Sequence, residues 1–374
     1  MTRTPLGLAF GGLLAIAAGI GIGRFVYTPI LPPMVEALGL SQSQAGLIAS
    51  ANFVGYLAGA LLAALRLPGS RRAWLLAGLA VNVACLAAMG LTVSLTLFLL
   101  LRLIAGIASA FILIFASALV LDRLAAAGRS PLSAVHFAGV GSGIAASAAL
   151  VAPLSDWRTM WLAGAALALV ASIAAWALVP ADRPGAPATM PGGRTKLDGR
   201  FLRTAAAYGL FGFGYIITAT FIVAMVRGSQ EIAALEPYIW VMFGLAAVPS
   251  VALWTRLGWR WGILEAYAAA AIVEAVGVAA SALWITEATV ILSSILVGGT
   301  FMGLTALGLI AAREGEGDPR GRIALMTSSF GAGQILGPAF AGYAHDLTGS
   351  FAVPSWCAAA ALVLAAVLCR PRRR

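Results

Sequence analysis

The feature that most constrains the fold is a series of long apolar stretches separated by short polar loops. A helix needs roughly 20 apolar residues to cross a bilayer, whereas the strands of a membrane barrel would show short alternating segments. The stretches have helical length, and they predict twelve spans: 6–31, 43–65, 73–91, 95–120, 134–154, 159–179, 203–226, 236–254, 261–284, 288–311, 323–345 and 352–369. Only 10% of the residues are charged, against about 25% in a soluble domain, and 61% are hydrophobic. We therefore predict an all-α integral membrane protein that spans the lipid bilayer many times.

The positions of the basic residues predict how these spans are oriented. Twenty of the 24 Lys and Arg residues fall in the loops and termini on one side of the predicted bundle. Arg158 and Arg227 fall on the other side, and Arg24 and Arg102 lie within spans. Because cytoplasmic loops carry an excess of Lys and Arg, both termini are expected to be cytoplasmic, in a bacterial inner membrane. The same positions explain the net charge of +10, so nucleic acid is not an expected partner.

A long central loop divides the chain into two similar halves. It is rich in Pro, Gly and Arg and predicts a cytoplasmic linker over 180–202, between six-helix bundles over 1–179 and 203–374. Short matches between the halves recur at an offset of 190–192 residues. The matching pairs are Arg24 with Tyr215, Arg66 with Arg256, Arg102 with Ser294, and Gly139 with Gly331. Parallel six-helix repeats of this kind place a substrate site between the halves, near the bilayer midplane.

The sequence carries no motif of an enzyme or a metal centre. Its three cysteines, Cys85, Cys357 and Cys369, lie within or at the ends of apolar runs, without the spacing of metal ligands. HExxH, GxxxxGK[ST] and GxSxG patterns do not occur, and the Gly-rich runs lie inside predicted helices, where they favour close helix packing. We therefore expect no enzymatic activity, no cofactor and no bound metal.

Several motifs resemble one family of membrane proteins. Twelve spans in a 6+6 repeat with a long central loop resemble the major facilitator superfamily of secondary transporters. The run Gly21-Ile-Gly-Arg-Phe-Val-Tyr-Thr-Pro-Ile-Leu-Pro32, with Leu40-Ser-Gln-Ser-Gln-Ala-Gly46 and Asn52-Phe-Val-Gly-Tyr56, is similar to its bacterial YbfB/YjiJ-like branch. Arg102-Leu-Ile-Ala-Gly106 resembles the arginine motif of the superfamily's fourth helix. The resemblance implies a monomer that alternates between inward-open and outward-open states, with helices 1, 4, 7 and 10 lining the cavity.

One departure from the superfamily concerns the loop after the second span. That loop usually carries an acidic residue, and Arg66 stands in its place here. The charge relay that this acid supports is therefore not expected in its usual form.

Arg24 and Arg102 are the leading candidates for contact with a substrate. An ionised guanidinium in hydrocarbon costs several kcal/mol, so each must face the protein interior or a wet cavity. At about 1.5 Å per residue, both lie in the outer half of the bilayer. With no carboxylate on either helix at that depth, the pair favours binding of a carboxylate or phosphate through bidentate hydrogen bonds. The alternative is that each arginine pairs with backbone carbonyls or with an acid at a helix end, such as Asp156.

Other polar residues within the spans complete the candidate set. Aromatic and amide side chains could finish the substrate site, or could equally bond one helix to another; they are Tyr27, Asn52, Tyr56, Tyr215 and Gln334. His136 and Glu274 are the candidates for proton coupling. Alternatively, His136 could cap a helix end through its hydrogen bonds, and Glu274 could be a neutral carboxylic acid that forms hydrogen bonds within the bundle.

These observations predict a secondary active transporter of a small organic solute, anionic and coupled to protons. A multidrug/proton efflux antiporter is a second transport hypothesis, favoured by an aromatic cavity with few fixed charges in the second half. A non-transporting membrane sensor or scaffold belongs to a different class and would call for a soluble signalling domain. The longest predicted loop is the 23-residue linker 180–202, which is too short for one.

Overall fold

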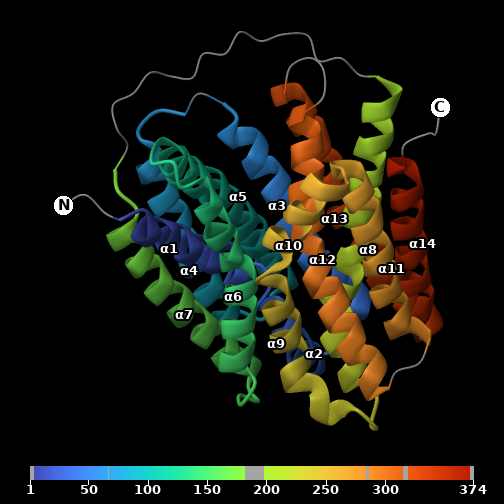
Figure 1. The fold of residues 1–374 in the computed structure, drawn as a ribbon. Coiled ribbons are helices and arrows are strands. Elements are labelled where there is room, and N and C mark those ends of the chain that lie inside the picture. The colour runs from blue at the N-terminus through green and yellow to red at the C-terminus, as the bar shows by residue number, and fades with distance from the viewer. Residues whose placement is uncertain (1–3, 66, 182–197, 284–285, 315–318, 371–374) are drawn as a thin grey trace.

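The computed structural model describes residues 4–65, 67–181, 198–283, 286–314 and 319–370, and the regular structure within these ranges is helical (Figure 1). The all-α prediction is therefore confirmed. The first helix group comprises α1 (Pro5–Ile16), the π-helix η1 (Ala17–Ile22), α2 (Tyr27–Leu38), α3 (Gln42–Ala63), α4 (Arg71–Leu91), α5 (Leu95–Ala126), the 3-10 turn η2 (Ser130–Leu132), α6 (Ser133–Val151) and α7 (Trp157–Leu178). The second helix group comprises α8 (Gly199–Arg227), the 3-10 turn η3 (Ala233–Leu235), α9 (Glu236–Ala247), α10 (Ser250–Trp261), α11 (Ile263–Leu283), α12 (Glu287–Glu314), α13 (Pro319–Thr348) and α14 (Ala352–Cys369).

Most of the predicted spans coincide with described helices that are long and apolar enough to cross a membrane. Among these residues, ten helices are long and apolar enough to cross a membrane, and α9 with α10 makes an eleventh as a pair bent by 41°. The predicted span 323–345 falls in α13, which has 30 residues but is not among the eleven. Since α13 packs between α3 and α8, its surface meets protein more than lipid and has less need of apolar side chains. Arg66 and most of the predicted linker 180–202 lie outside the described residues.

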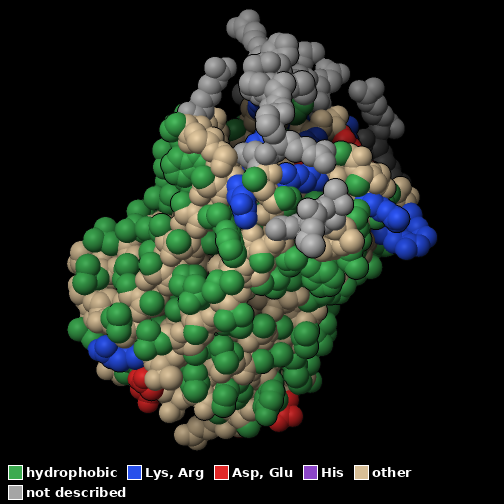
Figure 2. Space-filling view, turned by 90° about the vertical axis from the view of Figure 1, so that its left-hand side faces the viewer, with side chains coloured by type: hydrophobic (Ala, Val, Ile, Leu, Met, Phe, Trp, Pro, Cys, Tyr) green, Lys and Arg blue, Asp and Glu red, His purple; other side chains and the backbone are tan. Residues whose placement is uncertain are grey.

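The hydrophobic surface and the charged ends agree with a membrane-spanning bundle. Both termini and the residues flanking the central linker lie toward the same end of the molecule, which we call the terminal end (Figure 1). Figure 2 shows a broad hydrophobic band, with most of the visible Lys and Arg side chains above it near that end. The side chains therefore divide as a bilayer requires, with apolar groups in a belt and charges beyond it.

The first span is interrupted near its middle. A proline inside a helix ordinarily weakens or ends it, but α2 continues through Pro32 and Pro33 to Leu38. The interruption is the π-helix 17–22 and the turn that follows it, where side chains from other helices bond to backbone carbonyls. The amide of Asn82 donates to the carbonyl of Ala18 over 3.0 Å, and the Ser109 hydroxyl donates to that of Gly19 over 2.6 Å. Tertiary bonds of this kind make an irregular backbone stable inside a bundle.

One close contact between helices recurs in both helix groups, at the offset of the sequence repeat. In the first group, a Cβ built on Gly106 of α5 would lie 2.1 Å from the carbonyl oxygen of Asn52 on α3. In the second group, a Cβ on Gly298 of α12 would lie 2.4 Å from the carbonyl oxygen of Phe243 on α9. These pairs keep the offset of 191–192 residues found in the sequence. Glycine is needed at both positions because the backbones of the two helices are in direct contact.

We expect Gly298→Ala to lower the stability of the protein while Gly299→Ala leaves it unchanged or slightly raised. The added methyl at 298 meets backbone that cannot rotate away, at a cost of about 2 kcal/mol. At 299 the nearest atom to a new Cβ is the Ala246 oxygen at 3.9 Å, and alanine favours a helix by up to about 1 kcal/mol over glycine. Thermal unfolding of the two purified variants measures the difference. Equal melting temperatures would contradict the close contact between α9 and α12.

The two groups meet along α2, α3 and α6 on one side and α8, α9 and α13 on the other. At the end opposite the termini, a Cβ on Gly46 of α3 would lie 2.1 Å from the carbonyl oxygen of Pro338 on α13. A Cβ on Gly342 would lie equally close to the oxygen of Gln42. The backbones of the two groups therefore touch at this opposite end, which is closed.

Candidate functional site

Arg24 lies in the broken part of the first span, at the contact between the two groups. Its side chain is 6% exposed, and its guanidinium carbon lies 4.2 Å from the centre of the Tyr56 ring and 5.2 Å from that of Phe53. The Nε and Nη2 atoms of Arg24 are buried with no hydrogen-bond partner among the described residues. A buried cation with two free donors is a site for an acceptor that these residues do not supply.

The second group presents Tyr215 and Gln334 to this arginine. Both are buried, and the Gln334 amide forms a hydrogen bond with the Tyr215 hydroxyl. Arg24 and Tyr56 of the first group and Glu274 of the second group lie within electrostatic range of that hydroxyl. The structure therefore brings together four of the predicted substrate-binding residues, Arg24, Tyr56, Tyr215 and Gln334, two from each group.

Stacked aromatic rings surround Tyr215, and most of them were not predicted. Its ring lies 5.5 Å from that of Phe301 at an interplanar angle of 12°, and 6.0 Å from that of Phe330 at 1°. Phe211 stacks on Tyr215 at 5.1 Å, and Tyr208 stacks on Phe330 at 4.8 Å. A signal for Phe301 was present in the sequence, because it lies two helical turns after Ser294, the counterpart of Arg102, and so on the same face of the helix.

Arg102 has a different environment from Arg24. Its guanidinium is 2% exposed and donates from Nη1 to the carbonyl of Gly23 and from Nη2 to that of Arg24, both over 3.1 Å. This is the pairing with backbone carbonyls that the sequence left open. Asp156, the other alternative partner, instead caps α7, where the hydrogen bond from the Thr159 hydroxyl lowers the pKa of its carboxyl.

Tyr27 and Asn52 also bond to the backbone of the first group. The Tyr27 ring lies 5.1 Å from the Arg102 guanidinium carbon, and its hydroxyl donates to the carbonyl of Ala45 over 2.9 Å. The Asn52 amide donates to the carbonyl of Arg102 over 2.9 Å. The structure thus places Arg102, Tyr27 and Asn52 around the backbone that carries Arg24.

The two candidates for proton coupling lie in different parts of the molecule. Glu274 of α11 is fully buried, and neither carboxylate oxygen has a hydrogen-bond partner among the described residues. It is close enough to interact electrostatically with Tyr215 and Tyr267. His136 is fully buried near the terminal end, where its Nε2 lies 3.0 Å from the Ser117 hydroxyl and its Nδ1 has no partner within that described part. Glu274 therefore lies in the part of the second group that carries Tyr215, and His136 lies near the terminal end.

A cleft of about 860 Å³ lies between the two groups at the terminal end. The first group contributes residues of α5, η2 and α6 to its wall, and the second group contributes residues of α10 and α12. Because the opposite end is closed, this cleft makes the molecule open toward the terminal end.

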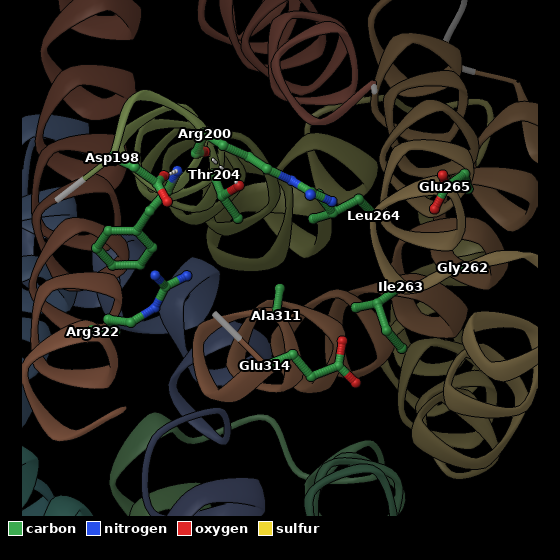
Figure 3. A pocket seen from close by; sticks show the side chains of 11 residues that line it. Asp198, Arg200, Thr204, Gly262, Ile263, Leu264, Glu265, Ala311, Glu314 and Arg322 are labelled. Atoms are coloured by element: carbon green, nitrogen blue, oxygen red, sulfur yellow. Dashed lines mark hydrogen bonds between the residues drawn. The ribbon is translucent and has the colours of Figure 1, made fainter. Parts of the chain in front are cut away.

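A second pocket, of about 490 Å³, lies within the second group at its terminal end (Figure 3). Arg200 reaches across it toward Leu264, and Arg322 stacks on the Phe201 ring at 4.1 Å. Acidic side chains line it as well, including Asp198, and none of the predicted site residues is among its lining. This pocket therefore carries both positive and negative side chains and is separate from the Arg24 region in its lining.

Comparisons with known proteins identify the fold and the family. Two solved structures of the nucleoside transporter NupG, one of them of a point mutant, align with 97% of this chain and 98% of their own. The TM-scores are 0.75 for the mutant and 0.70 for the other, at 16% sequence identity in both, which shows a shared fold. No curated protein matches the chain. A family described as the uncharacterised MFS-type transporter YbfB matches residues 16–370, and the chain therefore belongs to this family of major facilitator superfamily transporters.

Proposed function

We propose that this transporter carries a small organic anion, bearing a carboxylate or phosphate, across the bacterial inner membrane by alternating access. The observation that carries the proposal is the Arg24 guanidinium, buried between the two groups with Nε and Nη2 unpartnered among the described residues. An unpaired buried cation is costly, and a bound anion with two oxygens would relieve that cost.

The charges around Arg24 support an anionic substrate. Within the described ranges, the ion pairs are Arg71 with Asp122, and Arg227 with both Glu36 and Glu236, so none involves Arg24. The rings beside the guanidinium, those of Tyr56 and Phe53, stabilise a cation without neutralising it. The site therefore keeps a positive charge that a substrate carboxylate or phosphate could neutralise.

The proposed orientation places the terminal end in the cytoplasm. Twenty of the 24 basic residues belong to the loops and termini on that side, as the positive-inside rule requires of a cytoplasmic face. With the opposite end closed and a cleft at the terminal end, the structure then corresponds to the inward-facing state. We further propose two bundles, 1–179 and 203–374, that rock as bodies in a monomer, with 180–202 as their linker.

A neutral aromatic solute is the second candidate, favoured by the stacked rings around Tyr215. Such a solute could bind by stacking without using the charge of Arg24, as in multidrug efflux. Nucleosides are included among the neutral aromatic solutes to be tested, because the solved structures with this fold are described as nucleoside transporters.

Thermal stabilisation of the detergent-purified protein by a panel of metabolites distinguishes an organic anion from a neutral aromatic solute as the substrate. We expect carboxylates or organic phosphates to stabilise the wild type and to bind roughly 30- to 100-fold more weakly to Arg24→Gln, as befits the loss of a charge-assisted bidentate contact. Arg24→Lys keeps the charge and should lie between the two. Arg260→Gln, at an exposed residue of α10, is the control and should match the wild type. Stabilisation by nucleosides or lipophilic cations, equal in the wild type and Arg24→Gln, would contradict the anion hypothesis.

We propose that protons drive this transport and that Glu274 carries the transported proton. Its carboxylate is buried without a partner among the described side chains, and it lies within electrostatic range of Tyr215 beside the substrate region. His136 is the other candidate. In proteoliposomes, Glu274→Gln should abolish the dependence of substrate uptake on an imposed pH gradient while preserving substrate exchange. His136→Gln should keep that dependence. The opposite pattern would assign the coupling to His136.

A further inference from the structure

The cleft at the terminal end has an unusual combination of lining residues. Its wall is mainly apolar, with Phe137 from the first group and Met302 and Leu309 from the second. Four hydroxyl side chains also line it, those of Ser130, Ser133, Thr255 and Thr305, and both threonine hydroxyls are engaged within their own helices. That of Thr255 donates to the Val251 carbonyl over 2.6 Å, and that of Thr305 donates to the Phe301 carbonyl over 2.8 Å. Apart from its two serines, the uncharged wall of the cleft is therefore largely apolar.

The charged residues of this lining have one sign. They are Arg256 of α10 and Arg313 of α12, both exposed, and no acidic residue is part of the described lining. A cleft with apolar walls and two guanidinium groups is complementary to a molecule that combines an apolar body with a negative charge. Its volume of about 860 Å³ is that of a site for a drug-sized molecule.

The cleft is continuous in structure with the aromatic residues near Arg24. The carbonyl of Thr305, a lining residue, accepts a hydrogen bond of 3.1 Å from the Tyr208 hydroxyl. The Tyr208 ring stacks on Phe330, which lies parallel to the Tyr215 ring. Packed side chains therefore connect the wall of the cleft to Tyr215, which lies in the Arg24 region.

We propose that the substrate is an aromatic monoanion, a planar ring bearing one carboxylate, and that the cleft is its binding region at the terminal end. This inference rests on the proposed function and narrows it. Arg256 and Arg313 attract the carboxylate, and the apolar walls hold the ring. One carboxylate matches the two free nitrogens of Arg24, and the flat faces around Tyr215 match an aromatic ring.

Equilibrium binding of radiolabelled 2-naphthoate to the full chain in nanodiscs tests this proposal, with empty nanodiscs correcting for partition into lipid. Competition with neutral 2-naphthamide and with acetate separates the roles of charge and ring. We expect both competitors to bind at least tenfold more weakly than 2-naphthoate. The double variant Arg256→Gln/Arg313→Gln should bind 2-naphthoate about fivefold more weakly at low salt, with a smaller effect at high salt, because exposed charges are screened. Arg260→Gln, on the same helix but outside the lining, is the matched control.

The outcomes distinguish this inference from the proposed function. Acetate binding as tightly as 2-naphthoate, and lost in Arg24→Gln, would keep the anion transporter and overturn the aromatic substrate. If the double variant and Arg260→Gln bound 2-naphthoate equally well, the cleft arginines would have no part in substrate recognition. That result would also overturn the inference. Equal binding of 2-naphthamide and 2-naphthoate would overturn the anion hypothesis itself.

Discussion

Replacing Arg102 by glutamine is expected to lower the free energy of unfolding by about 3 kcal/mol, because two buried charge-assisted hydrogen bonds are lost. Those bonds join α5 to the carbonyls of Gly23 and Arg24, in the segment where the first span is broken. Without them, two carbonyls lose their donors in a bundle that excludes water. Arg102→Lys should be intermediate, since one ammonium group cannot reproduce the planar fork of a guanidinium.

Cysteine chemistry gives a direct measurement of this effect. Cys85 and Cys369 are buried and Cys357 is exposed, so in a Cys357→Ser background a thiol-reactive dye reports unfolding as the two buried thiols become accessible. Arg158→Gln is the matched control, because Arg158 also donates to a carbonyl, that of Gly90 over 3.2 Å, from an exposed position. We expect its melting temperature to stay close to that of the parent. If Arg102→Gln were as stable as this control but no longer bound substrate, Arg102 would be a substrate ligand, as the sequence alone favoured.

Removing the polar contacts that close the end opposite the termini should shift the protein toward a state open at that end. The Asp346 carboxylate of α13 accepts hydrogen bonds from the backbone nitrogens of Gln42 and Ser43, over 3.0 and 2.9 Å, at the start of α3. Arg227 bridges Glu36 of the first group at 2.8 Å and Glu236 of the second at 3.2 Å. The Asp346 contact is the stronger, because a carboxylate there also faces the positive end of the α3 dipole.

The double variant Asp346→Ala/Arg227→Gln should lose about 2 kcal/mol of stabilisation of the closed end, which is roughly a 30-fold change in the ratio of the two states. Spin labels at Ala37→Cys and Ala234→Cys, exposed positions in the two groups, would report the change as a second, longer distance in a cysteine-free background. Asp122→Asn removes an ion pair with Arg71 that lies within the first group, so it should leave the distances unchanged. Identical distance distributions in the wild type and the double variant would show that backbone packing alone closes this end.

The candidate site was predictable in composition but not in geometry. Arg24 and Tyr215 stood out because a charged or polar group in an apolar run is costly and the repeat relates the two positions. The sequence did not separate Arg24 from Arg102, since both are arginines at similar depth in apolar runs. Their difference depends on which acceptors lie within reach, and those of Arg102 are carbonyls 78 and 79 residues away in the chain.

The sequence by itself determined the membrane class, the helical spans and the family, because hydropathy, helix length and charge bias are properties of consecutive residues. Tertiary structure alone decided where the first span breaks, which end is closed and which polar groups stay unpaired. The carbonyl of Phe25 illustrates the reason. It lies in the turn where the first span is interrupted, and the Trp240 indole of the other helix group donates to it over 3.0 Å. A partner 215 residues away in the chain thus helps to hold the backbone at this interruption.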